Sequence, residues 1–223
     1  MTLAAAASPT VSATPASSVT PARVASLAGL LVAALGVVTV PLYFVYSGPP
    51  PAWNVLTRNL VTILLVPCFI VFLTAMRQVL RQAGMLSDLM YGSGLVYAAL
   101  VMVATSLESG PAIADPANRI DPTTTGPLAV GDILLHGSAT RAITALMMGA
   151  AAGAILRTGV LPRWLGGAAV VVAAANVACV PSLFFGADAA RFYTALGWGN
   201  SALTASLVCY WAGAAGIAMR RMS

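Results

Sequence analysis

Six continuous apolar stretches limit what this chain can fold into more than any other feature of its sequence. A helix needs about 20 mainly apolar residues to cross the hydrocarbon core of a bilayer. The strands of a membrane barrel would instead alternate between apolar and polar residues. The stretches therefore predict an all-α membrane protein, a bundle of six transmembrane helices. They cover residues 24–46, 56–76, 89–107, 133–156, 164–185 and 196–219.

The composition of the whole chain agrees with this prediction. Of its 223 residues, 59% are hydrophobic and 8% are charged, whereas about 45–50% and 25% are usual in soluble domains. The mean hydropathy is +0.90. These values exclude an ordinary soluble domain, a collagen, a disulfide scaffold and a largely disordered chain. The lipid bilayer is therefore the first partner that we expect.

The charged residues predict how the six helices are oriented. All 11 basic residues are arginines. Seven of them flank the predicted spans on the side of the membrane where both termini lie, and only one of the six acidic residues lies on that side. Because basic residues accumulate on the cytoplasmic side of a membrane, we predict cytoplasmic termini and a location in the cell inner (plasma) membrane. The net charge of +5 then reflects topology, and we expect no nucleic-acid partner. The seven residues are Arg23, Arg77, Arg81, Arg157, Arg163, Arg220 and Arg221.

Residues outside the apolar stretches divide the chain simply. Residues 1–22 are rich in Ala, Ser, Thr and Pro and carry no charged side chain, so they predict a disordered cytoplasmic tail before a single membrane domain at 23–223. Cys68, Cys179 and Cys209 all fall within predicted spans, without the spacing of a metal site. They are interpreted as small packing residues. We expect neither a metal nor a cofactor.

Small residues and prolines predict where helices pack and bend. Small residues recur every four positions in the first, fourth and sixth spans, and such rows allow helices to approach closely in a membrane. Pro41, Pro67 and Pro181 lie within spans and are expected to bend them. Residues 108–132 contain four prolines, so a loop is expected there. The rows are Ala25, Gly29 and Ala33; Ala145, Gly149 and Gly153; and Ala212 and Gly216.

The turn at residues 157–167 reads Arg-Thr-Gly-Val-Leu-Pro-Arg-Trp-Leu-Gly-Gly. Its Gly-x-Leu-Pro-Arg-Trp-Leu-Gly pattern resembles a turn between late spans in uncharacterised six-span integral membrane proteins of high-GC bacteria, a domain of unknown function. The similarity extends loosely over all six spans. It implies a fold and a topology, and it carries no activity. The pattern also has a structural explanation, because Pro162 can start a helix while Trp164 lies at the membrane interface.

One group of polar residues collects at the outer ends of the predicted spans. Asp132 and His136 are four residues apart and share one helix face, and a histidine beside a carboxylate can move protons. Glu108, Asp132 and His136 are therefore the candidate catalytic residues. The competing interpretation is that Asp132 caps its helix and the others lie among hydrated headgroups. The group is Arg58, Glu108, Asp132, His136, Arg141 and Asn200.

A second group lies deeper in the membrane. Asn176 falls near the middle of the fifth span, where an unpaired amide is costly, so it should face another helix or a cavity. Tyr97 and Tyr210 could form hydrogen bonds in the same way. The candidate ligand-binding residues are Arg58, Arg141, Asn176 and Tyr97. The competing interpretation is that these side chains only hold helices together.

Three functions remain open from the sequence. The first is a non-enzymatic accessory protein, or one that binds a lipophilic small molecule, because no central charge or catalytic motif is evident. The second is a membrane-embedded isoprenoid (terpene) cyclase, which would use a carboxylic acid such as Glu108 or Asp132 as proton donor. The third is a small-molecule transporter or exporter with proline-bent spans. The sequence does not determine the oligomeric state.

Overall fold

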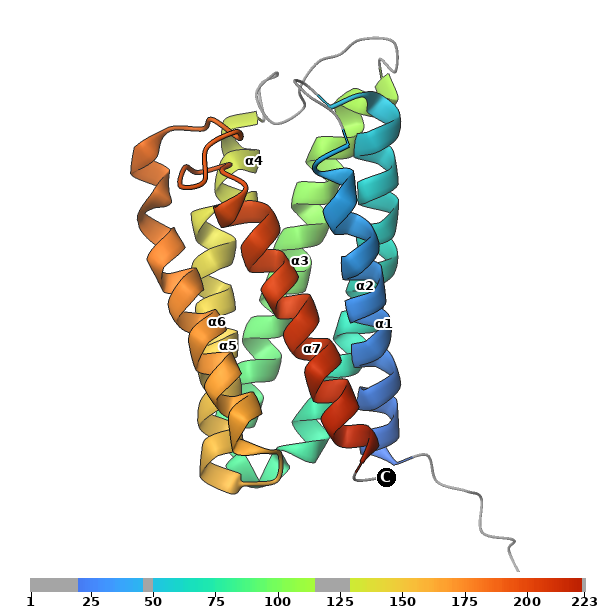
Figure 1. The fold of residues 1–223 in the computed structure, drawn as a ribbon, viewed down its shortest axis with the longest axis vertical. Coiled ribbons are helices and arrows are strands. Elements are labelled where there is room, and N and C mark those ends of the chain that lie inside the picture. Colours follow the sequence, from blue (N-terminus) through green and yellow to red (C-terminus); the bar gives the residue numbers. More distant parts are fainter. Residues whose placement is uncertain (1–19, 46–49, 115–128, 222–223) are drawn as a thin grey trace, which may run out of the picture.

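The computed structural model describes residues 20–45, 50–114 and 129–221, and in these ranges the chain is helical (Figure 1). Six of the helical segments are long and apolar enough to cross a membrane, which confirms a multispanning helical membrane protein. Most of the predicted tail lies in residues 1–19, outside the described residues. The α-helices are α1 (Pro21–Leu42), α2 (Ala52–Val79), α3 (Met85–Ala114), α4 (Ala129–His136), α5 (Ser138–Thr158), α6 (Arg163–Cys179) and α7 (Thr204–Arg220).

Three of the spans combine segments of different helical type. The fourth span, Gly131–Thr158, is made of α4 and α5 with Gly137 between them. The fifth continues beyond α6 as a 3-10 helix, Val180–Phe185, and the sixth begins as a π-helical segment, Gly199–Leu203, before α7. All three irregular segments lie at the end of the bundle opposite the chain termini (Figure 1).

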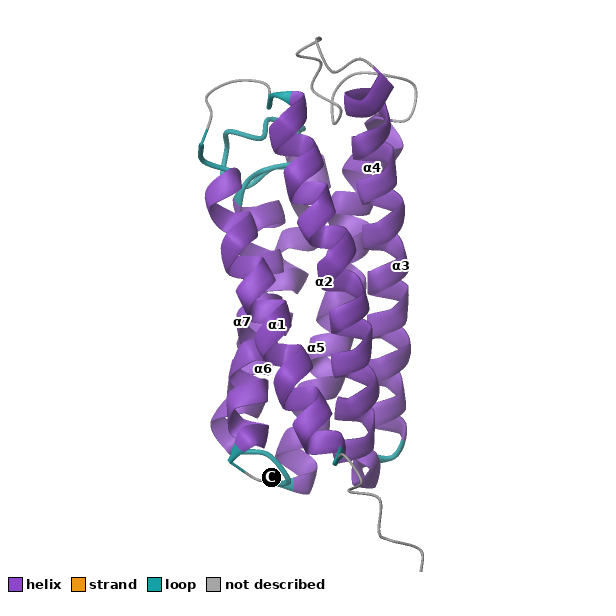
Figure 2. Cartoon of the chain, turned by 90° about the vertical axis from the view of Figure 1, so that its right-hand side faces the viewer, coloured by secondary structure: helices purple, strands orange, loops and turns teal. Residues whose placement is uncertain are grey.

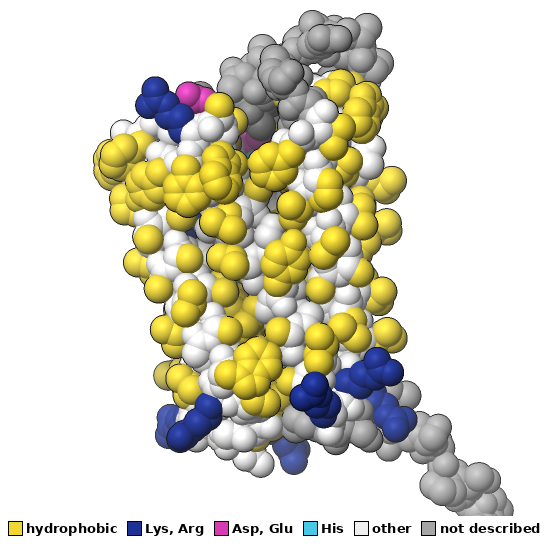
Figure 3. Space-filling model, viewed as in Figure 1, with side chains coloured by type: hydrophobic (Ala, Val, Ile, Leu, Met, Phe, Trp, Pro, Cys, Tyr) yellow, Lys and Arg dark blue, Asp and Glu magenta, His cyan; other side chains and the backbone are white. Residues whose placement is uncertain are grey.

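The helices form one elongated bundle (Figures 1 and 2). Helix α1 packs against α2 and α7, α3 packs against α2 and α5, and α6 packs mainly against α5. The described ends of the chain, at α1 and α7, lie at the same end of the bundle. We call it the basic end, because exposed arginines gather there (Figure 3). Of the residues predicted on this side, all seven arginines are exposed.

The row of small residues in the first span is a packing face, as predicted, and the structure shows that its partner is the sixth span. A Cβ atom placed on Gly29 would lie 2.5 Å from the backbone oxygen of Ala212, and one on Gly216 would lie 2.8 Å from the oxygen of Ser26. The prediction is wrong for Gly149. That residue is exposed and has no atom of the fold within 4 Å of its Cβ position.

Proline positions also differ from the expectation. Helix α3 runs through Pro111 to Ala114 and does not end near Leu107, because this last part is held by buried contacts of Glu108 and Ala112 with the bundle. Pro181 does not bend α6, which already ends at Cys179. Pro41 is the penultimate residue of α1. The remainder of the expected loop, residues 115–128, lies outside the described residues.

Candidate functional site

A cavity lies in the half of the bundle remote from the basic end, between α1, α2, α3, the α4–α5 span and α7. Its volume is about 120 Å³, and it is partly open to the surroundings. Apolar side chains such as Leu65, Val66 and Val101 form much of its wall. The polar part of the wall includes Tyr97, Glu108, His136 and Arg141. Four of the seven candidate residues therefore line one cavity.

Glu108 is bound by Arg58, another candidate residue. The Arg58 Nη2 atom donates to Glu108 Oε1 at 2.8 Å, and the two side chains are 6% and 10% exposed. The guanidinium also lies over the ring of Tyr43, 4.4 Å from its centroid. The expectation of hydrated headgroup surroundings is wrong for this pair. The pair is buried between α2 and α3, where each side chain is the counter-charge of the other.

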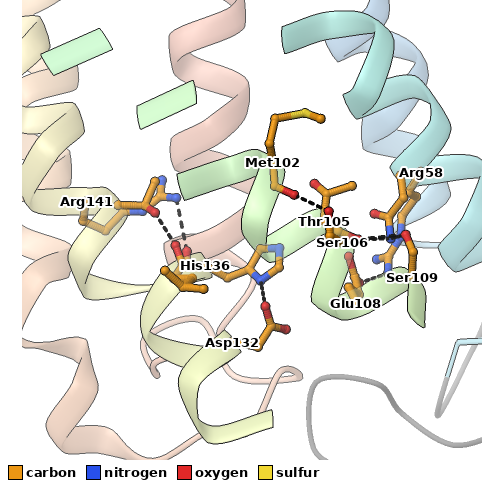
Figure 4. A network of polar contacts seen from close by, with 12 residues as sticks. Arg58, Met102, Thr105, Ser106, Glu108, Ser109, Asp132, His136 and Arg141 are labelled. Carbon is orange, nitrogen blue, oxygen red and sulfur yellow. Dashed lines mark hydrogen bonds and ion pairs between the residues drawn. The ribbon is translucent and has the colours of Figure 1, made fainter. Parts of the chain in front are cut away.

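His136 is held by Asp132, as their spacing predicted. The distance between His136 Nδ1 and Asp132 Oδ1 is 3.0 Å, and the residue Asp132 is 1% exposed. Asp132 does not cap the helix, because α4 begins three residues earlier at Ala129. In Figure 4 the His136 ring points toward α3, the helix that carries Glu108, with Asp132 beside it. Asp132 thus positions a histidine at the cavity without lining the cavity itself.

Arg141 is buried, with 4% of its surface exposed, and its hydrogen-bond partners among the described residues are uncharged. Its Nη1 atom donates to Thr204 Oγ1 and, at 3.4 Å, to Asn176 Oδ1. Its Nη2 atom donates to the backbone oxygen of His136 at 3.2 Å. No carboxylate of the described residues lies within 4.0 Å of this guanidinium. The fully buried Asn176 is therefore a support for Arg141 at the cavity wall.

The other polar residues singled out from the sequence lie elsewhere. Asn200 is buried and donates to the backbone oxygen of Ala195 at 2.7 Å, which ties the segment before α7 together. Tyr210 is 43% exposed on the outside of the bundle. Tyr97 lines the cavity and packs edge-on against Phe69. The seven candidates thus lie in one region. Asn200 reaches it only through its backbone oxygen, which accepts from Thr204 Oγ1, and Tyr210 lies outside it.

Two contributors were missed by sequence reasoning. Thr204 accepts from Arg141, and Asn59 donates to Ser109 Oγ at 2.8 Å beside the Arg58–Glu108 pair. Both are polar residues within apolar spans, and both are buried. Asn59 directly follows Arg58 in the sequence, which was the one available signal. Nothing in the sequence placed Thr204 opposite Arg141, 63 residues away.

The arrangement differs from the one that an acid-catalysed cyclase needs. In a cyclase, the carboxylic acid has to offer a proton to an apolar substrate, whereas the Glu108 carboxylate already accepts from Arg58 and the Asp132 carboxylate contacts His136. The described residues contain no group of three metal-ligating side chains. Cys209 lines the cavity as a free thiol. The cavity wall combines the cationic hydrogen-bond donor Arg141 with apolar side chains.

Comparisons of the chain with protein-family models, curated proteins and solved structures find no match. The resemblance of the 157–167 turn to a bacterial six-span family thus has no family match to support it. In the structure this turn joins α5 to α6 at the basic end, with Gly159 in the left-handed conformation that ends α5. A functional proposal for this chain therefore rests on its fold and on the residues that line its cavity.

Proposed function

We propose that this membrane protein binds a small lipophilic molecule in the cavity between α1, α2, α3, α5 and α7, and that it acts without catalysing a reaction on it. The observation that carries the proposal is the combination of a partly open cavity of about 120 Å³ with a largely apolar wall and a few polar side chains. Ligand sites in proteins typically have this composition, in which apolar surface supplies affinity and few polar groups fix the orientation.

The candidate residues then take two kinds of role. Arg141, His136, Glu108 and Tyr97 contact the ligand, because they line the cavity. The remaining three hold these side chains in place: Arg58 binds Glu108, Asp132 binds His136 and Asn176 binds Arg141. This division explains why so many polar groups are buried in one half of the bundle, although buried polar groups inside a membrane are costly.

We also propose that the basic end faces the cytoplasm, in the plasma membrane. The support is the concentration of arginines there, which follows the rule for membrane proteins. Under this orientation the cavity lies in the outer half of the membrane and is reached from the lipid or from the outside.

Labelling of single cysteines introduced at Arg81 and at Asp188, in intact and in opened cells, tests this orientation. Both positions are exposed and lie at opposite ends of the bundle. A variant in which Cys68, Cys179 and Cys209 are replaced provides the background.

Filling the cavity tests the binding function. Ala104 is buried and lines the cavity, so Ala104→Leu would occupy part of its volume. Ala142 is exposed on α5, and Ala142→Leu is the matched control. We expect calorimetric titration with 1-octanol and with octanoate, in the same detergent, to show binding by the wild type and by the control but much weaker binding by Ala104→Leu. Equal binding by all three proteins, or by none of them, would contradict the proposed function.

A further inference from the structure

We infer that the molecule bound in this cavity is a small lipophilic carboxylate, and that the guanidinium of Arg141 binds its two oxygens. This inference rests on the proposed function and specifies its ligand. It starts from the partners of Arg141, which differ from those of the other buried arginine. Arg58 has the Glu108 carboxylate at 2.8 Å, whereas all the described partners of Arg141 are neutral oxygens.

The hydrogen bonds of Arg141 leave two of the five N–H groups of its guanidinium unused. A guanidinium has five N–H groups in a planar fork, and Nη1 uses both of its groups on Asn176 and Thr204. Nη2 uses one group on the His136 carbonyl, and Nε, which is buried, donates to no acceptor of the described residues. The Nε and Nη2 atoms form the edge whose two parallel N–H bonds match one carboxylate.

The position of Arg141 makes an anionic ligand favourable. It lies ten residues from the start of the span Gly131–Thr158, which is about 15 Å along a helix. A buried charge without a counter-charge is strongly disfavoured in such surroundings. The two acidic residues in this half that the structure shows as buried, Glu108 and Asp132, already contact Arg58 and His136. A carboxylate in the cavity would match the charge of Arg141.

The surroundings of Arg141 also prepare it for this role. Asn176 and Thr204 bind Nη1 from α6 and α7, and the His136 carbonyl binds Nη2 from α4. These contacts hold the guanidinium in place, so little side-chain entropy is lost when a ligand binds. The apolar body of the ligand would lie against Leu65, Val66 and Val101 on the α2 and α3 side. The single matched charge and the small volume favour a carboxylate over a phosphate.

A matched pair of probes separates this inference from the proposed function. Octanoate and 1-octanol share the same chain and differ in the head group. We expect the purified wild type at neutral pH to bind octanoate at least about tenfold more tightly than 1-octanol. Failure of both probes to bind would overturn the proposed function itself. Binding of both with equal affinity would overturn only the carboxylate inference, as would tighter binding of octyl phosphate than of octanoate.

Variants of Arg141 test whether this residue causes the preference for octanoate over 1-octanol. Arg141→Met keeps the apolar part of the side chain, and we expect it to bind octanoate no more tightly than 1-octanol. Arg141→Lys keeps the charge without the planar fork and should retain only part of the preference. Arg157→Met, at an exposed arginine of the basic end, is the control and should behave as the wild type. A full preference in Arg141→Met would overturn the inference. If that variant does not fold, the comparison of Arg141→Lys with the wild type decides.

Discussion

The two halves of the bundle are built from the same six spans but in different ways. Toward the basic end, the interior consists of large apolar side chains such as Leu73, Met76, Met148 and Ile155, all at most 1% exposed. In the opposite half, the interior holds two buried arginines, two buried acids and a cavity. One half is packed as a stable core is packed, whereas the other contains the groups that a stable core normally excludes.

Under the proposed function, the half with the buried charges is the binding half and the closely packed half is its support. Buried charges inside a membrane are expensive to keep and mark functional sites by default. The closely packed half provides the rigid frame, through the α1–α7 contact and the aromatic contact of Phe72 with Trp211. The opposite half uses that frame to hold polar groups at fixed positions. Substitutions should therefore have different consequences in the two halves.

The largest effect on stability is expected from breaking the buried ion pair. Arg58→Ala should lower the free energy of unfolding by about 3–5 kcal/mol, because it leaves Glu108 buried without its counter-charge. The matched control is Arg77→Ala at the basic end, where Arg77 and Asp88 also lie 2.8 Å apart but are 44% and 60% exposed. Exposed pairs contribute at most about 1 kcal/mol. Denaturation in mixed micelles measures both changes, and equal effects would contradict the contrast between the halves.

A smaller effect is expected from shortening apolar side chains on α2. Leu73→Ala should cost about 3 kcal/mol, since it opens a cavity in a closely packed region where Leu73 is 1% exposed. Leu65→Ala, two turns away at the wall of the existing cavity, should cost about half as much because Leu65 is only partly buried. The same denaturation assay tests the pair. Equal losses at Leu65 and Leu73 would show that the two halves are packed alike.

The smallest effect is expected from enlarging a glycine. Gly29→Leu should destabilise the protein by about 1–3 kcal/mol by overpacking, since its Cβ would meet the Ala212 backbone, which cannot rotate away as a side chain can. Gly149→Leu, at an exposed position with open space, should be neutral or slightly stabilising. Thermal unfolding of the two variants distinguishes these outcomes, and destabilisation by Gly149→Leu would indicate a contact at that face.

Much of the fold could be predicted from the sequence, because the length of an apolar run is a direct physical requirement of the bilayer. The contact of His136 with Asp132 was also predictable, since residues four apart on a helix are neighbours. The pairing of Arg58 with Glu108 and of Arg141 with Asn176 and Thr204 was not. These contacts depend on how helices that are distant in the sequence are rotated and how deep they lie in the membrane. The sequence does not reveal that rotation, because the side of a helix that faces lipid is as apolar as the side that faces the core.

Local helix geometry was the other source of error. A loop was expected from residue 108 onward because of its four prolines, the first of which is Pro111, yet α3 continues for three residues beyond Pro111. The intrinsic preference of proline was outweighed there by tertiary contacts, notably that of Glu108 with Arg58. Gly149 shows the opposite case, in which a pattern typical of helix contacts lies on an exposed face. Spacing alone does not state which side of a helix meets a neighbour.

We propose solid-state NMR in lipid bilayers as the direct test of whether Arg141 binds a carboxylate in the cavity. Octanoate labelled with carbon-13 at its carboxyl group is added to protein labelled with nitrogen-15 at its arginine side chains. We expect a carbon–nitrogen dipolar contact within about 4 Å, the separation in a bidentate pair, which disappears in Arg141→Lys. The absence of this contact in the wild type, or its persistence in Arg141→Lys, would show that Arg141 does not bind the carboxylate.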